Sequence, residues 1–170
     1  MSKHAHDAGF PDPGHDHETC LARAVSRAEA AFEQRGMRMT DLRRKVLKEI
    51  ASSHCAIGAY DILDRLARRS DKRLAPISVY RALDSLVEAG VVHRLESRNA
   101  FFACHGRHAR DRRQIVLACE GCGTVAEVGD DVAFERIGDA ARKNGFEPSR
   151  MLVEVIGTCA PCAAANHDQG

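Results

Sequence analysis

Apolar side chains recur every three to four residues over the first half of the chain, a spacing typical of helices that bury one face. The pattern predicts a helix over residues 19–35 that stops at Gly36, and a second helix capped by Thr40. A third helix follows Gly58, and a fourth opens at Pro76 and ends at Gly90. The positions that define these four faces are Leu21, Val25, Ala28 and Phe32; Leu42, Val46, Leu47 and Ile50; Tyr60, Ile62, Leu63 and Leu66; and Val79, Leu83, Leu86 and Val87.

After Gly90 the helical pattern gives way to short apolar runs that are typical of strands. Residues 91–95 and 100–103 form two such runs, and residues 97–99 between them suit a turn. Helices followed by a hairpin are the pattern of a winged-helix domain. In that arrangement the last helix before the hairpin enters the major groove of DNA.

The C-terminal third predicts a small second domain. Residues 105–113 are polar and predict a hinge, and strands are expected over residues 114–118, 124–128 and 151–156. Asp130 or Asp131 caps a helix that runs to about Asn144. The last strand is almost entirely apolar, which predicts burial on both faces. A three-stranded sheet with one helix cannot cover itself, so we expect a homodimer.

The predicted fold is therefore α+β, with an N-terminal winged-helix DNA-binding domain and a small C-terminal dimerisation domain. We expect a disordered tail over residues 1–18, the winged-helix domain over 19–104, the hinge over 105–113 and the dimerisation domain over 114–170. The tail contains His4, His6, His15 and His17, which offer at most loose metal binding. The tail lacks the apolar core of a signal peptide. The sequence contains no run of 18 apolar residues, so no membrane span is predicted. We expect a cytoplasmic protein with reduced cysteines.

Charge is distributed unevenly along the 170 residues, although the net charge is only +1. Lys and Arg outnumber Asp and Glu by 17 to 9 over residues 36–115, whereas acids outnumber bases by 9 to 4 over residues 116–170. A basic segment that coincides with a predicted winged helix favours binding to the phosphates of double-stranded DNA. The alternative is an ordinary solvated surface.

The outward side of the fourth helix carries the predicted DNA contacts. Arg81 is the leading candidate to read a base, because a guanidinium bonds guanine at two points. Ser78 and Tyr80 are candidates for contact with phosphate or a thymine methyl, and Tyr60 either meets the DNA backbone or packs in the core. Arg94 and Arg98 in the hairpin are candidates for the minor groove or for phosphate, or are solvated charges.

Two Cys-x-x-Cys pairs predict a metal site that holds the second domain together. Cys119 and Cys122 form one pair, and Cys159 and Cys162 form the other after 36 intervening residues. Two such pairs supply the four thiolates that structural zinc prefers, and the glycines around the first pair suit a tight turn. The alternative is a redox dithiol or a disulfide.

A second predicted metal site lies around the hinge. Its candidates are His93, Cys104, Glu127 and one of His105 and His108, between which spacing does not decide. A thiolate, imidazoles and a carboxylate suit zinc better than manganese or magnesium. Each residue alone would have a packing or surface role. Cys20, His54 and Cys55 show no comparable cluster and are interpreted as structural.

Residues 76–96 and 58–63, together with the order of the two Cys-x-x-Cys pairs, resemble the ferric uptake regulator (Fur) family. Within that family the chain looks most like the zinc uptake regulators, Zur. The resemblance covers roughly residues 20–165. It implies structural zinc at the four paired cysteines, regulatory zinc at His93, Cys104 and Glu127, and DNA contacts at Tyr60 and Arg81. The hinge departs from the family pattern, because residues 110–113 carry arginines where many relatives have histidine. The position of the histidine ligand is therefore open, and His108 is our preferred fourth ligand.

The function that the resemblance implies is a zinc-responsive repressor that binds palindromic operators of zinc-uptake genes as a homodimer. It would hold at least two zinc ions per chain. An iron- or peroxide-sensing relative is the alternative within the family, although the soft thiol of Cys104 argues against it. A Cys-x-x-Cys thiol oxidoreductase is the alternative outside it. No nucleophile with a matching base is evident in the sequence, so we expect no enzyme activity.

Overall fold

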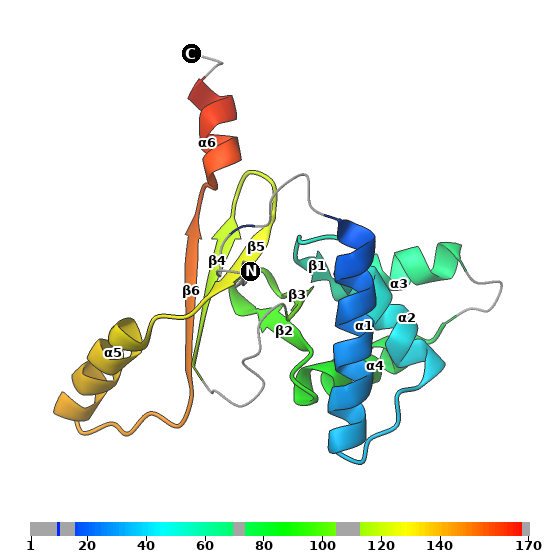
Figure 1. Cartoon of the computed structure of the whole chain (residues 1–170), viewed down its shortest axis with the longest axis horizontal. Helices are drawn as coiled ribbons and strands as arrows, with labels where there is room; N and C mark the ends of the chain where they lie inside the picture. Colours follow the sequence, from blue (N-terminus) through cyan, green and yellow to red (C-terminus); the bar gives the residue numbers. More distant parts are fainter. Residues whose placement is uncertain (1–9, 11–15, 70–73, 105–112, 168–170) are drawn as a thin grey trace, which may run out of the picture. The chain divides into compact units, whose positions relative to one another are not determined.

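The computed structural model describes residues 10, 16–69, 74–104 and 113–167 (Figure 1). The chain divides into two compact units, one within residues 12–105 and the other within residues 106–170. Helices and strands occur in both, which confirms the predicted α+β class. None of the helices in the described ranges is long and apolar enough to cross a membrane.

Helix α1 (His17–Gln34) begins earlier than predicted, inside the expected tail. The side chain of Asp16 explains this start, because it accepts hydrogen bonds from the backbone N–H groups of Glu18 and Thr19 at 3.1 and 3.2 Å. His17 is consequently part of the helix, and its Nε2 lies 2.6 Å from the carbonyl oxygen of Ser52. The other tail histidines, His4, His6 and His15, lie outside the described residues.

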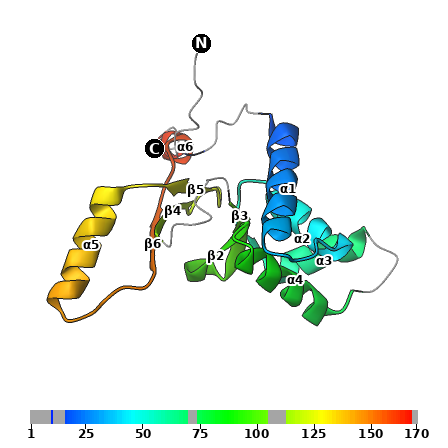
Figure 2. The ribbon, with the colours of Figure 1, turned by 60° about the horizontal axis from the view of Figure 1, so that its bottom comes forward.

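Helices α2 (Asp41–Ala51), α3 (Ala59–Arg68) and α4 (Pro76–Glu88) follow the predicted pattern. They lie with α1 beside a small sheet (Figure 2), and their apolar faces form a core around Phe32, Leu47, Ile62 and Leu83. Gly90 adopts a φ of +73° directly after α4, a conformation that favours glycine and ends the helix. The predicted stop at this position is therefore confirmed.

Thr40 caps α2 as predicted, because its hydroxyl accepts a hydrogen bond from the N–H of Arg43 at 3.3 Å. Thr40→Ala is expected to lower the free energy of unfolding by about 1 kcal/mol, since that N–H loses its partner. Chemical denaturation of the two proteins measures the difference. Thr40→Ser keeps a capping hydroxyl and should stay close to the original stability.

The hairpin strands β2 (Val92–Leu95) and β3 (Ala100–Ala103) pair antiparallel, joined by a single 3₁₀ turn at Glu96–Arg98. Asn99 follows in the left-handed region with a φ of 47°. A two-residue strand that was not predicted, β1 (Ile57–Gly58), pairs with the other side of β3. The sheet order is thus β1-β3-β2, and β3 is its centre.

The second unit is built on β4 (Arg113–Cys119), which pairs antiparallel with β5 (Val125–Val128) and parallel with β6 (Met151–Gly157). Helix α5 (Asp131–Lys143) connects β5 to β6, and its predicted cap is confirmed by the bond from Ala133 N–H to Asp130. A further helix, α6 (Ala160–His167), was not predicted.

The predicted burial of the last strand on both faces is wrong for the single chain. Val155 and Ile156 on β6 are 48 % and 47 % exposed. The reason is the sheet order β5-β4-β6, in which β6 is an edge strand and the central strand is β4. Apolar composition alone does not distinguish a strand covered by its own chain from one that a second chain could cover.

Candidate metal centres and nucleic-acid interface

The four paired cysteines meet at one end of the second sheet. Cys119 ends β4, Cys122 lies in the turn before β5, and Cys159 and Cys162 lie directly before and within α6. Their sulfur atoms all lie within 4.8 Å of one another, and Sγ of Cys122 is 3.7 Å from Sγ of Cys159. That separation is far longer than a disulfide bond, and none of the four cysteines forms a disulfide in this structure, so all four sulfurs can serve as metal ligands.

Two glycines allow the first pair to approach the second so closely. A Cβ atom on Gly121 would lie 3.0 Å from Sγ of Cys162, so a larger residue would crowd the fourth thiol. Gly123 has a φ of +74°, which L side chains rarely adopt. The tight turn predicted from these glycines is present.

Hydrogen bonds prepare two of the four thiols for ionisation. The backbone N–H of Cys159 donates to Sγ of Cys119 at 3.3 Å, and with the N–H of Cys122 it lowers the pKa of Cys119 to about 6. Hydrogen bonds from Thr124 lower the pKa of Cys122. The neighbouring thiols, with Cys159 first, raise the pKa of Cys162 to about 12. Four thiolates repel one another without a cation, and a divalent ion at their centre removes that penalty.

The donor set of this cluster fits a tetrahedral metal site. Four sulfur ligands suit zinc or an iron–sulfur centre and leave no open position for a substrate. Cys119 and Cys159 are buried, Cys162 is half-buried and Cys122 is exposed. The arrangement therefore suits a structural ion that ties α6 to the β4–β5 turn.

His93 and Cys104 form a pair in the first unit. His93 lies on β2 opposite Phe102, and Cys104 follows β3 directly, where its N–H donates to the carbonyl of Val91 at 3.0 Å. A ring nitrogen of His93 and Sγ of Cys104 lie within 4.8 Å of each other. The structure thus brings together two of the predicted regulatory ligands.

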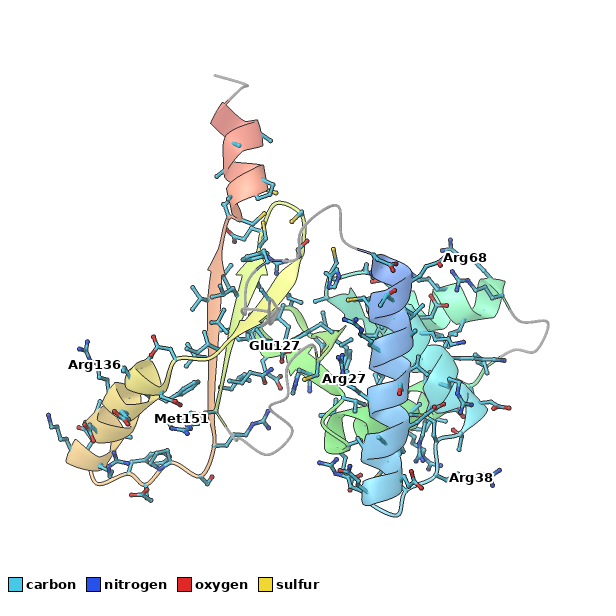
Figure 3. The ribbon with its side chains drawn as sticks, in the orientation of Figure 1. Arg27, Arg38, Arg68, Glu127, Arg136 and Met151 are labelled. Carbon is cyan, nitrogen blue, oxygen red and sulfur yellow. The ribbon has the colours of Figure 1, made fainter. Side chains whose placement is uncertain are left out.

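Arg27 supports this pair and was missed by sequence reasoning. Its Nη2 donates to the carbonyl oxygen of Cys104 at 2.9 Å, across 77 positions of the sequence (Figure 3 labels Arg27). The bond fixes the backbone of Cys104 at the end of the described part of the first unit. An arginine on an exposed helix face gives no sequence signal for such a contact.

Glu127, labelled in Figure 3, projects from β5 in the second unit and is almost fully buried at 7 % exposure. It is paired across the ladder with Val116, and its Oε1 accepts a hydrogen bond from the side-chain amide of Gln114. The remaining predicted ligands, His105 and His108, lie outside the described residues.

The predicted DNA contacts gather on α4 and the start of α3. Arg81 is exposed, Tyr80 is 38 % exposed, and Ser78 is half-buried. Tyr60 is 74 % exposed, which rules out the alternative that it packs in the core. Desolvation and then a hydrogen bond with Tyr60 raise the pKa of Tyr80, so the two hydroxyls lie together. In the hairpin, Arg94 donates to Asn99 at 2.7 Å and Arg98 is exposed.

Comparison with known proteins identifies the family of the chain. The family model described as "Ferric uptake regulator family" matches residues 34–156, which is most of the chain. The chain belongs to the ferric uptake regulator family. Membership makes this Fur-family protein a transcription regulator rather than an enzyme, so the thiol oxidoreductase alternative is set aside.

Among Fur-family proteins, zinc uptake regulators resemble the chain strongly. The zinc uptake regulation protein of Escherichia coli (strain K12) is 34% identical over 145 residues, covering 85% of this chain and 84% of the relative. A solved "Zinc Uptake Regulator Complexed With Zinc AND DNA" superposes with a TM-score of 0.79 at 33% identity, covering 86% of this chain and 97% of that one. The crystal structure of holo XcZur gives a TM-score of 0.72 at 40% identity, covering 82% and 96%.

Proposed function

We propose that the chain is a zinc-responsive repressor that binds palindromic operators of zinc-uptake genes as a homodimer. The observation that carries this proposal is the thiol of Cys104 beside the imidazole of His93. A thiolate with imidazole selects zinc over manganese or magnesium, which prefer oxygen ligands. The likeness to zinc uptake regulators, one of them solved with zinc and DNA, supports the choice.

In this proposal each chain holds at least two zinc ions. One is structural, bound by Cys119, Cys122, Cys159 and Cys162. The other is regulatory, bound by His93, Cys104, Glu127 and a hinge histidine, His108 or in its place His105. The proposed regulatory ligands lie before, within and after the segment 105–112, so zinc there would restrict the angle between the two units.

Regulation follows from differential binding of zinc to two arrangements of the units. Zinc favours the DNA-competent arrangement only to the extent that it binds that arrangement more tightly. A tenfold preference shifts the equilibrium by about 1.4 kcal/mol. Since thiolate and imidazole must lose their protons to bind, the response to zinc weakens in acid.

The homodimer would form through the second unit. Val155 and Ile156 leave apolar surface exposed on the edge strand β6, and Val132, Ile137 and Phe146 are exposed nearby in sequence on and after α5. Apolar side chains on an edge strand are a surface that a second copy can cover. A two-fold dimer presents two α4 helices to the two halves of a palindrome.

Arg81→Ala is expected to lower operator affinity by about 1–3 kcal/mol, roughly 5- to 150-fold, because the bidentate contact with a base is lost. The zinc content should not change, since α4 carries no metal ligand. Arg136→Ala, which removes an exposed arginine from α5 in the second unit, is the matched control. Fluorescence anisotropy with labelled operator measures the DNA affinity of both variants. Equal affinity of the two variants would place the base-reading residue elsewhere.

The test of the proposed function measures binding of the purified protein to the DNA upstream of its own gene. The binding is followed over a range of free zinc, iron(II) and manganese(II) concentrations, and the metal content per chain is measured alongside. Tight binding that appears only as zinc rises, with more than one zinc per chain, supports the zinc sensor. A stronger response to iron or manganese would instead favour the iron- or peroxide-sensing alternative. Binding that no metal changes would refute metal regulation.

A further inference from the structure

Gln114 and Glu127 lie on one face of the second sheet. Val116 on β4 is paired with Glu127 on β5, and Gln114 lies two residues before Val116. Because side chains alternate along a strand, Gln114 and Glu127 point to the same side as diagonal neighbours. The amide Nε2 of Gln114 donates to Oε1 of Glu127.

The chemistry of this donor suits a carboxylate that binds a cation. Glu127 is buried, and the other buried acid in the described residues, Glu49, pairs with the guanidinium of Arg69 at 2.5 Å. An amide is neutral, so it fixes one oxygen of Glu127 while leaving the carboxylate its negative charge. Carboxylates that ligate metals are commonly held by such hydrogen bonds.

The surroundings of Glu127 offer it another position. A cavity of about 310 Å³ lies beside it, lined by Arg113, Gln114, Glu127, Asp130, Asp131 and Phe134. Arg113 directly precedes Gln114 on β4 and so points to the other face, where it lies 3.6 Å from Asp131 and over the ring of Phe134 at 5.9 Å. A carboxylate released from Gln114 has room to turn into this cavity, away from the position in which the amide holds it.

We propose that Gln114 is a positioning residue for the regulatory metal. It holds Glu127 ready to ligate and keeps it from turning into the neighbouring cavity. This inference rests on the proposed function, since it takes Glu127 as a zinc ligand. It goes further by assigning part of the zinc affinity to a residue that does not touch the ion.

The test is Gln114→Met, which keeps a side chain of similar length and removes the amide donor. In the full-length protein with its four-cysteine site filled, a competing chelator measures zinc affinity at the regulatory site. We expect zinc affinity at the regulatory site to fall about 10- to 100-fold, the usual effect of removing a hydrogen bond that orients a metal ligand. Cobalt(II) at that site should retain its thiolate absorption band, because Cys104 still binds.

A double-mutant cycle separates positioning from a general structural effect. In a Glu127→Gln background, Gln114→Met should change metal affinity no further, because the ligand that it positions is already altered. Asn144→Ala removes a hydrogen bond that another side-chain amide donates in the same unit, and it should leave zinc affinity unchanged. No loss in Gln114→Met, or the same loss in both backgrounds, would overturn the inference.

Failure of the proposed function gives a different result. If Glu127→Gln itself binds regulatory zinc normally, or if the unaltered protein takes up no second zinc, the assignment of Glu127 as a ligand is wrong and the role of Gln114 falls with it. If Glu127→Gln weakens binding and Gln114→Met does not, only the positioning role is refuted.

Discussion

Replacing Cys119 by serine is expected to empty the proposed structural zinc site and unfold the second unit. Structural zinc contributes about 10–16 kcal/mol of apparent binding free energy in small domains, which exceeds the total stability of many of them. Cys119 is the buried end of the central strand β4, and the N–H of Cys159 points at its sulfur. A serine hydroxyl cannot replace a thiolate there.

Loss of the proposed dimer should accompany loss of zinc from this site, because the exposed apolar residues of β6 belong to the same sheet. Metal analysis, circular dichroism and light scattering coupled to gel filtration would report zinc content, folding and mass together. Cys20→Ser is the matched control, since Cys20 lies on α1 outside both clusters of donor atoms. A Cys119→Ser protein that remains dimeric with unchanged zinc content would contradict a structural role for the cluster.

The sequence predicts the features of this chain that depend on local spacing. Thr40, Pro76 and Gly90 mark helix ends through their own backbone chemistry, so those ends are where the pattern places them. Each Cys-x-x-Cys pair is likewise a local turn, and Gly121 fits because any side chain there would crowd Cys162. The meeting of the two pairs agrees with the preference of one metal ion for four thiolates.

Features that depend on tertiary contacts were missed. Strand β1 has only two residues and exists because it pairs with β3, so no period is long enough to predict it. Helix α6 contains an alanine run without a clear apolar face. The exposure of β6 follows from its place at the sheet edge, which composition does not encode. Arg27 donates a hydrogen bond to Cys104, and Gln114 donates one to Glu127. No spacing rule connects the two residues of either pair.

In the proposed mechanism, the response to zinc depends on Cys104. Cys104→Ser is expected to abolish tight zinc-dependent operator binding while the protein stays folded and dimeric. Serine keeps the shape of the side chain but is a poor zinc ligand, so the regulatory site loses its only thiolate. The structural site lies in the other unit and should keep its zinc, so metal content should fall to one zinc per chain at moderate free zinc. Anisotropy titrations of operator at fixed free zinc measure the response.

Cys55→Ser is the matched control, because Cys55 is a half-buried thiol of the same unit that belongs to neither cluster of donor atoms. It should bind operator in response to zinc as the unaltered protein does. At very high zinc, Cys104→Ser should regain part of its DNA binding, since His93 and Glu127 still offer ligands and the DNA-binding surface on α4 is intact. A wild-type zinc response in Cys104→Ser would mean that the sensing ion is bound elsewhere. A loss of DNA binding that no zinc concentration restores would instead show that Cys104 supports the fold of the winged helix, where it is buried beside β2.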